Sequence, residues 1–256
     1  MKAVRAKKFL GQHFLINEEI ARRITDLISN KHNKNILEIG PGMGVLTKYL
    51  HEKDIDLRLV EIDRESVLYL TNKFPELKDN IFEQDFLKIN LIEIFSENIS
   101  IIGNFPYNIS SQILFKVYEN YEKVDTIVGM FQKEVAERVT SQTGRKKGIL
   151  SVLLQTFYNI EYCFTVDENQ FSPPPKVKSA VIRLVRNKRK KLDVDLKPYK
   201  MIIKAAYNQR RKTINNALKS FNLKKDEKIK HLLNLRAENL SVDDFITITS
   251  NIQAWK

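Results

Sequence analysis

The chain has 256 residues, of which 43% are hydrophobic and 9% aromatic, which is enough for a large core and a smaller second domain. No apolar run approaches the ~18 residues of a membrane-spanning helix, and no apolar signal region follows the basic N-terminus, so we expect neither membrane insertion nor secretion. The single cysteine, Cys163, cannot form an internal disulfide. The four histidines lack the spacing of metal ligands, and we expect no metal site.

The net charge of +12 is unevenly distributed along the chain. Residues 186–256 contain 18 Lys or Arg and 7 Asp or Glu, whereas residues 1–185 contain 25 and 24. A basic region of this kind favours a polyanionic partner, most often nucleic acid. A solvated, lysine-rich helical surface is the alternative interpretation.

Residues 9–15, Phe-Leu-Gly-Gln-His-Phe-Leu, form an apolar segment that is too short for a core helix. Two interpretations fit this segment: a lid over a pocket, or a hydrophobic plug for the first helix. That helix is predicted at residues 17–29, because apolar residues recur there with helical spacing.

The stretch from Ile36 to Gly44 predicts a strand, a tight turn and the start of a helix, with glycines at positions 40, 42 and 44. It lacks the phosphate-loop pattern, and its third glycine comes one residue earlier than in dinucleotide-binding loops. Glu38 also disfavours a pyrophosphate. A zwitterion with an α-amino group suits the loop better, and a purely structural turn is the alternative. The pattern Glu-x-Gly-x-Gly-x-Gly resembles the first motif of S-adenosylmethionine-dependent methyltransferases.

Acidic residues lie at the ends of the next two predicted strands, 57–62 and 81–86. Glu61 follows the first glycine of the loop by 21 residues, where nucleoside-binding folds place an acceptor for ribose hydroxyls. Asp63 is a candidate cap for the following helix. Asp85 can accept a hydrogen bond from an adenine amino group.

The sequence Asn-Phe-Pro-Tyr, residues 104–107, follows the fourth predicted strand, 99–103. In a doubly wound sheet ligands bind beyond the carboxyl ends of the strands, so this corner should face the glycine loop. It resembles the Asn/Asp-Pro-Pro-Tyr motif of methyltransferases that act on the amino group of adenine. A simple turn at the end of a strand is the alternative.

Each residue of this corner has an expected role in such chemistry. The side-chain oxygen of Asn104 and the carbonyl of Phe105 would accept hydrogen bonds from the adenine amino group, which is otherwise a weak nucleophile. Pro106 offers no competing N–H donor. Tyr107 would stack on one face of the base, and Phe171 could cover the other.

The remaining pattern predicts the fold. Strands that alternate with helices indicate a parallel, doubly wound sheet, and one of the last two strands should be antiparallel because no long crossover helix separates them. Beyond the basic boundary at residues 186–191 the strand signals stop. The later strands are predicted at 124–131, 160–166 and 179–185, and the later helices at 133–139, 148–158, 198–207, 211–221, 225–233 and 242–252.

Together these motifs resemble the ribosomal RNA small-subunit adenine dimethyltransferase family, KsgA-type. The resemblance covers nearly the whole chain and implies a Rossmann-like class I methyltransferase sheet with a small, all-helical C-terminal domain. It implies a catalytic domain that binds S-adenosylmethionine, residues 1–187, and a basic RNA-recognition domain, residues 188–256. Its motifs are residues 9–15, 38–44, 104–107, 132–135, 171–177, 208–214 and 236–241.

The resemblance also implies an activity. S-adenosylmethionine would donate methyl groups to two adjacent adenines in a hairpin loop near the 3′ end of small-subunit ribosomal RNA, as free RNA or within a pre-assembled subunit. We expect a cytoplasmic monomer without membrane attachment that also contributes to subunit biogenesis. The runner-up is the sister family that dimethylates large-subunit RNA and confers antibiotic resistance. A nicotinamide oxidoreductase is disfavoured by Glu38 and Asn104, and a non-catalytic assembly factor is a further alternative.

Site residues follow from the same resemblance. His13 stands where many relatives have asparagine, so a backbone contact is expected there. Basic side chains near residue 211 should meet RNA phosphates, although one or two of them could instead tie the two domains together. The expected cofactor contacts are His13, Leu15, Gly40, Gly42, Glu61, Asp85 and Asn104, and the expected RNA contacts are Arg210, Arg211 and Lys212.

Overall fold

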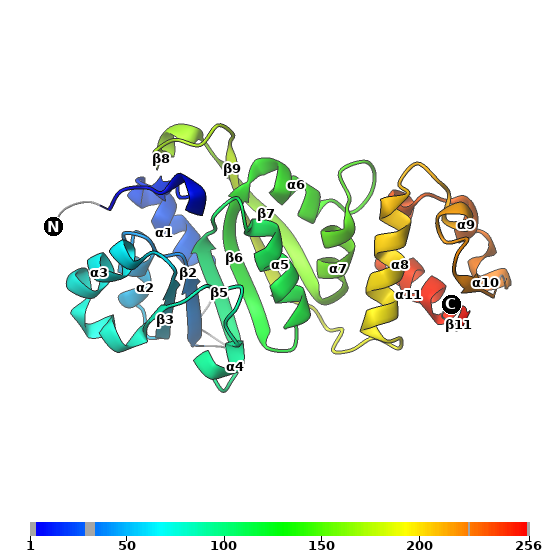
Figure 1. Cartoon of the computed structure of the whole chain (residues 1–256), viewed down its shortest axis with the longest axis horizontal. Helices are drawn as coiled ribbons and strands as arrows, with labels where there is room; N and C mark the ends of the chain where they lie inside the picture. The colour runs from blue at the N-terminus through cyan, green and yellow to red at the C-terminus, as the bar shows by residue number, and fades with distance from the viewer. Residues whose placement is uncertain (1–3, 29–33, 225, 255–256) are drawn as a thin grey trace. The chain divides into compact units, whose positions relative to one another are not determined.

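The computed structural model describes residues 4–28, 34–224 and 226–254 (Figure 1). They form two compact units: unit 1 lies within residues 1–136 and 159–186, and unit 2 within 137–158 and 187–256. The segment 137–158 was predicted to belong to the first domain, but it groups with the C-terminal helices. The division of roles between two domains stays a prediction. Ser29 and Lys225, at the ends of two predicted helices, lie outside the described residues.

A seven-stranded sheet organises unit 1, with the strand order β4-β3-β2-β5-β6-β9-β7 (Figure 1). Neighbouring strands from β4 to β6 are parallel, whereas β9 is antiparallel to β6, which confirms the expected antiparallel strand. The strands are β2 (Asn35–Ile39), β3 (Asp56–Glu61), β4 (Ile81–Glu83), β5 (Ile99–Asn104), β6 (Val124–Gln132), β7 (Tyr158–Val166) and β9 (Ser179–Arg186).

The central strands are almost entirely apolar because both of their faces are covered. On β5, for example, Ile99, Ile101 and Ile102 are fully buried. The helices of unit 1 lie between the strands in the chain. They are α1 (Glu18–Asp26), α2 (Thr47–His51), α3 (Arg64–Lys73), α4 (Leu91–Ile94) and α5 (Ser110–Glu119), with 3₁₀ segments η1 (Lys8–Leu10), η2 (Pro75–Asn80) and η3 (Glu168–Gln170).

A second, two-stranded sheet was not predicted. β1 (Phe14–Leu15) pairs antiparallel with β8 (Phe171–Ser172), so the N-terminal segment is held against the proline-containing loop. Two very short strands carry little sequence signal, and their pairing joins residues that are far apart in the chain.

Unit 2 is mainly helical. Its core contains Tyr199, Ile202, Phe245 and Ile248, all fully buried. Its helices are α7 (Ile149–Phe157), α8 (Leu196–Asn208), α9 (Ile214–Ala217), α10 (Glu227–Lys230) and α11 (Val242–Ser250), with 3₁₀ segments η4 (Leu232–Asn234) and η5 (Ala237–Asn239); α6 (Lys133–Thr140) spans the boundary between the units. No helix of the described segments combines the length and apolar character that crossing a membrane requires.

Three details of unit 2 differ from the prediction. The helix expected at 225–233 is divided into α10 and the 3₁₀ segment η4. The helix expected at 211–221 is only one turn long, because Thr213 instead forms a β-bridge with Arg236. A short ladder of β10 (Asn222–Leu223) with β11 (Ile252–Ala254) also interrupts the expected all-helical pattern, so α11 ends before residue 252.

One buried carboxyl group connects the sheet to the helix that follows the glycine loop. Glu38 on β2 is 1% exposed, and its Oε2 accepts a hydrogen bond from the Thr47 hydroxyl at 2.7 Å. Burial, together with the nearby carboxylate of Glu61, raises the pKa of Glu38 to about 8. Glu38 is therefore mostly protonated at neutral pH.

This pKa predicts a pH dependence of stability. Between about pH 4.5 and about pH 8 the unfolded chain loses the Glu38 proton while the folded protein keeps it, so the free energy of unfolding should fall as the pH rises through this window. The contribution reaches up to about 1.4 kcal/mol per pH unit. Glu38→Gln should fold and should remove this contribution, as measured by chemical denaturation from pH 5 to pH 8. Glu52→Gln, at an exposed site, is the matched control, and an unchanged slope in Glu38→Gln would contradict the assignment.

Candidate active site

The carboxyl ends of the parallel strands open onto a cavity of about 160 Å³ in unit 1. In the sheet, β3 lies on one side of β2 and β5 lies on the other, so the strand order reverses at β2. The cavity lies at this reversal, which is the position at which doubly wound sheets bind ligands. The cavity therefore brings together segments that are distant in sequence. Its lining consists of residues 10–14, 39–40, 42, 60–62, 84–87 and 104–109.

The glycine loop forms one wall of the cavity. Gly40, Gly42 and Gly44 all have positive φ, at 64°, 56° and 74°, a region that favours glycine. A Cβ at Gly42 would also lie 2.8 Å from the Phe14 ring, whereas the nearest atom to one at Gly40 would be 3.8 Å away. The predicted strand–turn–helix order is thus confirmed, and Gly40 leaves its backbone accessible from the cavity.

Glu61 connects this loop to the end of β3. Its Oε2 accepts a hydrogen bond from the Gly42 N–H at 3.0 Å, and its Oε1 accepts one from the Asp63 N–H at 2.9 Å. The side chain is 4% exposed, and this burial raises the pKa of Glu61. Each carboxylate oxygen retains a further lone pair, so Glu61 can still accept a hydrogen bond from a ligand.

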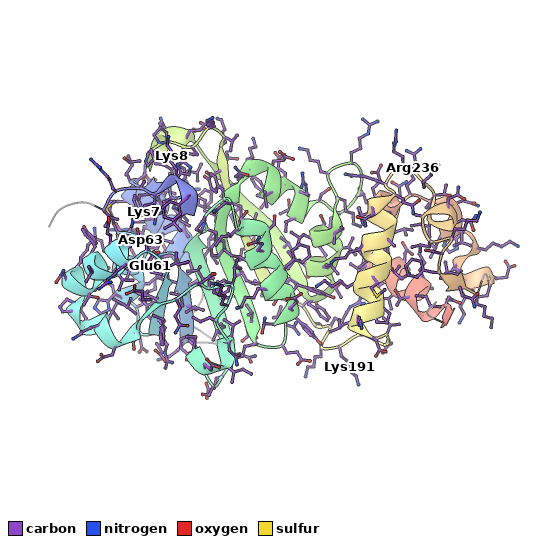
Figure 2. All side chains as sticks on the ribbon, in the orientation of Figure 1. Lys7, Lys8, Glu61, Asp63, Lys191 and Arg236 are labelled. Atoms are coloured by element: carbon purple, nitrogen blue, oxygen red, sulfur yellow. The ribbon has the colours of Figure 1, made fainter. Side chains whose placement is uncertain are left out.

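Asp63 has two roles, and its sequence position predicted one of them. It caps α3, because its side chain accepts from the Glu65 N–H at 3.2 Å. It also binds the N-terminal segment: Lys7 Nζ, which lies beside it in Figure 2, donates at 2.5 Å, and Gln12 Nε2 donates at 3.2 Å. Lys7 and Gln12 were missed as site residues because only the fold brings them to the end of β3.

Asn104 lies at the carboxyl end of β5. Its Nδ2 donates to the carbonyl of His13 at 2.8 Å. This bond uses one N–H of the amide within the protein and fixes the orientation of the group, and the side-chain oxygen is the atom that can accept a hydrogen bond from a ligand. His13 thus binds Asn104 through its carbonyl, while its Nδ1 donates to the Pro173 carbonyl at 2.8 Å. Its backbone contact with the cofactor stays a prediction.

The Phe105 ring is buried behind the cavity. It packs edge-on against Phe131, with ring centroids 5.0 Å apart. Gly103 and Gly129 face each other on β5 and β6, and a Cβ on either would overlap the Phe105 ring. The Phe105 N–H donates to the Met130 carbonyl at 3.2 Å, which fixes the backbone of the corner.

Tyr107 completes the corner. Its ring lies 5.4 Å from the His13 ring, and its hydroxyl is hydrogen-bonded to Ser179. Burial raises the pKa of Tyr107. Pro106 and Tyr107 both line the cavity and are half-buried, so the phenol ring is held at the edge of the site in a fixed orientation.

The other predicted site residues differ in whether they line the cavity or are buried in the core. Asp85 lines the cavity, with its Oδ1 accepting from the Leu87 N–H at 2.9 Å, but it follows β4 rather than ending it. Leu15 is 4% exposed and lines a smaller pocket with Glu38, Gly40 and Asn104. Phe171 is 3% exposed, pairs with Leu15 and belongs to the core instead of the cavity lining. Its position gives no support to the predicted stacking role.

The basic residues of unit 2 also separate into two kinds. The Arg210 guanidinium donates to Glu238 at 3.0 Å and to the carbonyls of Arg145 and Lys147. Arg210 therefore ties segment 137–158 to the helices that follow. Arg211 and Lys212 are exposed, and their contact with RNA stays a prediction.

Two solved structures share this fold. A dimethyladenosine transferase from Plasmodium falciparum aligns with a TM-score of 0.77 at 24% identity, covering 92% of this chain and 96% of that one. The 23S rRNA methyltransferase ErmE aligns with a TM-score of 0.74 at 24% identity, covering 94% and 100%. They confirm the predicted class I methyltransferase fold.

Sequence comparison gives closer relatives. The family model for "Ribosomal RNA adenine dimethylase" matches residues 3–254. The Ribosomal RNA small subunit methyltransferase A of Flavobacterium johnsoniae is 50% identical over 256 residues, which are 99% of this chain and 98% of that protein. The enzyme of the same name from Cytophaga hutchinsonii is 52% identical over 253 residues, 98% of each chain. This chain belongs to the ribosomal RNA adenine dimethylase family.

Proposed function

We propose that the protein transfers methyl groups from S-adenosylmethionine to the amino groups of two adjacent adenines in the 3′ hairpin loop of small-subunit ribosomal RNA, and that it takes part in small-subunit biogenesis. The observation that carries the proposal is that the glycine loop, Glu61, Asp85 and the corner 104–107 line one cavity. A methyl donor and an adenine amino group could therefore meet there.

The charge of the cavity favours this donor over a nucleotide with phosphates. Among the described residues that line it, Glu61 and Asp85 are acidic and none is lysine or arginine. A sulfonium with a free amino group is cationic and suits such a lining, whereas a pyrophosphate would lack a counter-charge. Glu61 would accept hydrogen bonds from the ribose hydroxyls of the donor, and Asp85 would accept one from the adenine of the donor. Gly40 would allow close approach of the methionine part of the donor.

The corner supplies the chemistry at the acceptor. The bound donor would present an electrophilic methyl group. The Asn104 side-chain oxygen and the Phe105 carbonyl would accept hydrogen bonds from the two N–H groups of the adenine amino group, which favours the positive charge that develops on nitrogen. Both acceptors are preorganised, Asn104 by the His13 carbonyl and Phe105 by Met130. Tyr107 would stack on an adenine extruded from the RNA, and alignment would supply most of the rate.

The small-subunit target is preferred over the large-subunit one. The relatives at 50% and 52% identity are named for the small subunit and match nearly the whole chain. The likeness to the 23S enzyme, at 24% identity, concerns the fold alone. We further propose that the protein acts as a monomer in the cytoplasm, with Arg211 and Lys212 contacting RNA phosphates.

Asn104→Ala should reduce methyl transfer by about 10²- to 10³-fold or more, because it removes one preorganised acceptor. Thermal stability should change little. The measurement is transfer of labelled methyl groups into small subunits that lack the modification, followed by mapping of the modified bases. Asn104→Asp keeps an acceptor oxygen but loses the donor to His13, so it should retain more activity than Asn104→Ala. Unaltered methylation by Asn104→Ala would contradict the proposed role.

Glu61→Gln should weaken binding of S-adenosylmethionine by about 10- to 100-fold, because hydrogen bonds to a charged acceptor are among the stronger ones. Equilibrium titration of the donor measures this, and RNA affinity should be unchanged. Glu83→Gln, at the exposed end of β4, is the matched control. Equal donor affinity in Glu61→Gln and the wild type would exclude a ribose contact.

Charge reversal at Arg211 and Lys212 should weaken RNA binding and flatten its dependence on salt, by roughly one counterion for each lost phosphate contact. Donor affinity should be unchanged. Arg210→Ala should instead lower the stability of unit 2, because Arg210 is bound to Glu238 and to two carbonyls. A salt slope identical to that of the wild type in the double variant would show that these side chains do not meet phosphates.

A further inference from the structure

The side chain of Phe9 is unusually exposed for an aromatic residue. It is 77% accessible, more than any other large hydrophobic side chain of the described residues. A ring in water adds nothing to the hydrophobic stabilisation of the fold. Single exposed apolar residues are common, so its surroundings decide whether it has a role.

The backbone that carries this ring is fixed at three points. Phe9 lies in η1, which is closed by Gly11 at a φ of 65° through its N–H bond to the Lys8 carbonyl at 3.0 Å. Asn108 Nδ2 donates to the Phe9 carbonyl at 3.2 Å, and Lys7 is bound to Asp63. The ring is therefore held outward by an ordered turn.

This turn forms part of the rim of the cavity. Residues 10–14, directly after Phe9, line the cavity, and Asn108, which binds the Phe9 carbonyl, lines it as well. Asn108 also follows Tyr107, the proposed stacking partner of the target adenine. Phe9 consequently lies directly beside residues that line the cavity.

The charged residues near the Phe9 ring indicate which kind of partner it would bind. Lys8 directly precedes Phe9 and Arg5 lies four residues before it, and both are exposed. Lys7 and Lys8 lie on the side of unit 1 that carries Asp63 and Glu61 (Figure 2). An aromatic ring among cations is the arrangement with which proteins bind single-stranded nucleic acid, by stacking on bases and pairing with phosphates. An apolar protein partner would gain nothing from these cations.

We propose that Phe9 stacks on the unpaired RNA base next to the adenine in the cavity, while Arg5 and Lys8 contact the adjoining phosphates. The inference rests on the proposed function and adds a second stacking surface to it. Two adjacent target adenines make such a surface useful, because one base can be held at the rim while the other occupies the cavity.

The test compares Phe9→Ala, Phe9→Leu and Phe9→Trp with the wild type, using small subunits that lack the modification. Phe9→Ala and Phe9→Leu should raise the KM and the Kd for the subunit by roughly 5- to 150-fold, the range for loss of one base–aromatic stack, and Phe9→Trp should stay near the wild type. Donor affinity and thermal stability should not change. Ile92→Ala is the matched control, because Ile92 is 68% exposed on α4, which precedes the amino end of β5, away from the cavity.

Three results would overturn the inference. Wild-type affinity in Phe9→Leu would show that an aromatic ring is not needed, and an equal loss of donor affinity would show that Phe9 acts on the donor site. Wild-type KM and Kd in Phe9→Ala would exclude any contact. Failure of the wild-type protein to methylate the subunits would instead reject the proposed function, so the two failures are distinguishable.

Discussion

The hydrogen bond from the Asn104 side chain to the His13 carbonyl is the contact on which the site depends. It fixes the orientation of the amide, because one N–H of its nitrogen is bound within the protein while its oxygen can accept from a ligand. It also holds the N-terminal segment across the carboxyl ends of the strands. The orientation of the proposed catalytic acceptor and one wall of the cavity are thus set by the same interaction.

The N-terminal segment combines the two roles between which its sequence could not decide. Leu15 is buried in the hydrophobic core, so the end of the segment acts as the predicted plug. Residues 10–14 line the cavity, as a lid would. Asp63 binds this segment through Lys7 and Gln12, and Asn108 binds it through the Phe9 carbonyl. These polar contacts explain how so short an apolar segment keeps a defined conformation.

Charge is divided between the cavity and the surface around it. The lining carries the carboxylates of Glu61 and Asp85, which suit a cationic donor. Exposed cations lie elsewhere, with Arg5 and Lys8 near the rim and Arg211 and Lys212 in unit 2. The phosphates of an RNA would be attracted to these outer cations and repelled by the carboxylates of the cavity. A base is uncharged and could still enter the cavity. This division supports separate binding of donor and acceptor.

The sequence by itself determined the features that depend on a residue and its near neighbours: the glycine turn, the strand ends with Glu61 and Asn104, the Asp63 cap and the antiparallel strand. Only the tertiary structure decided which distant segments meet. In the folded chain Phe171 is buried and pairs with Leu15, and Lys7 and Gln12 bind Asp63. Arg210 joins two segments of unit 2, and the helix expected at 211–221 is shorter than predicted. Local patterns report backbone preference and burial, whereas these contacts depend on how the whole chain packs, which no local pattern encodes.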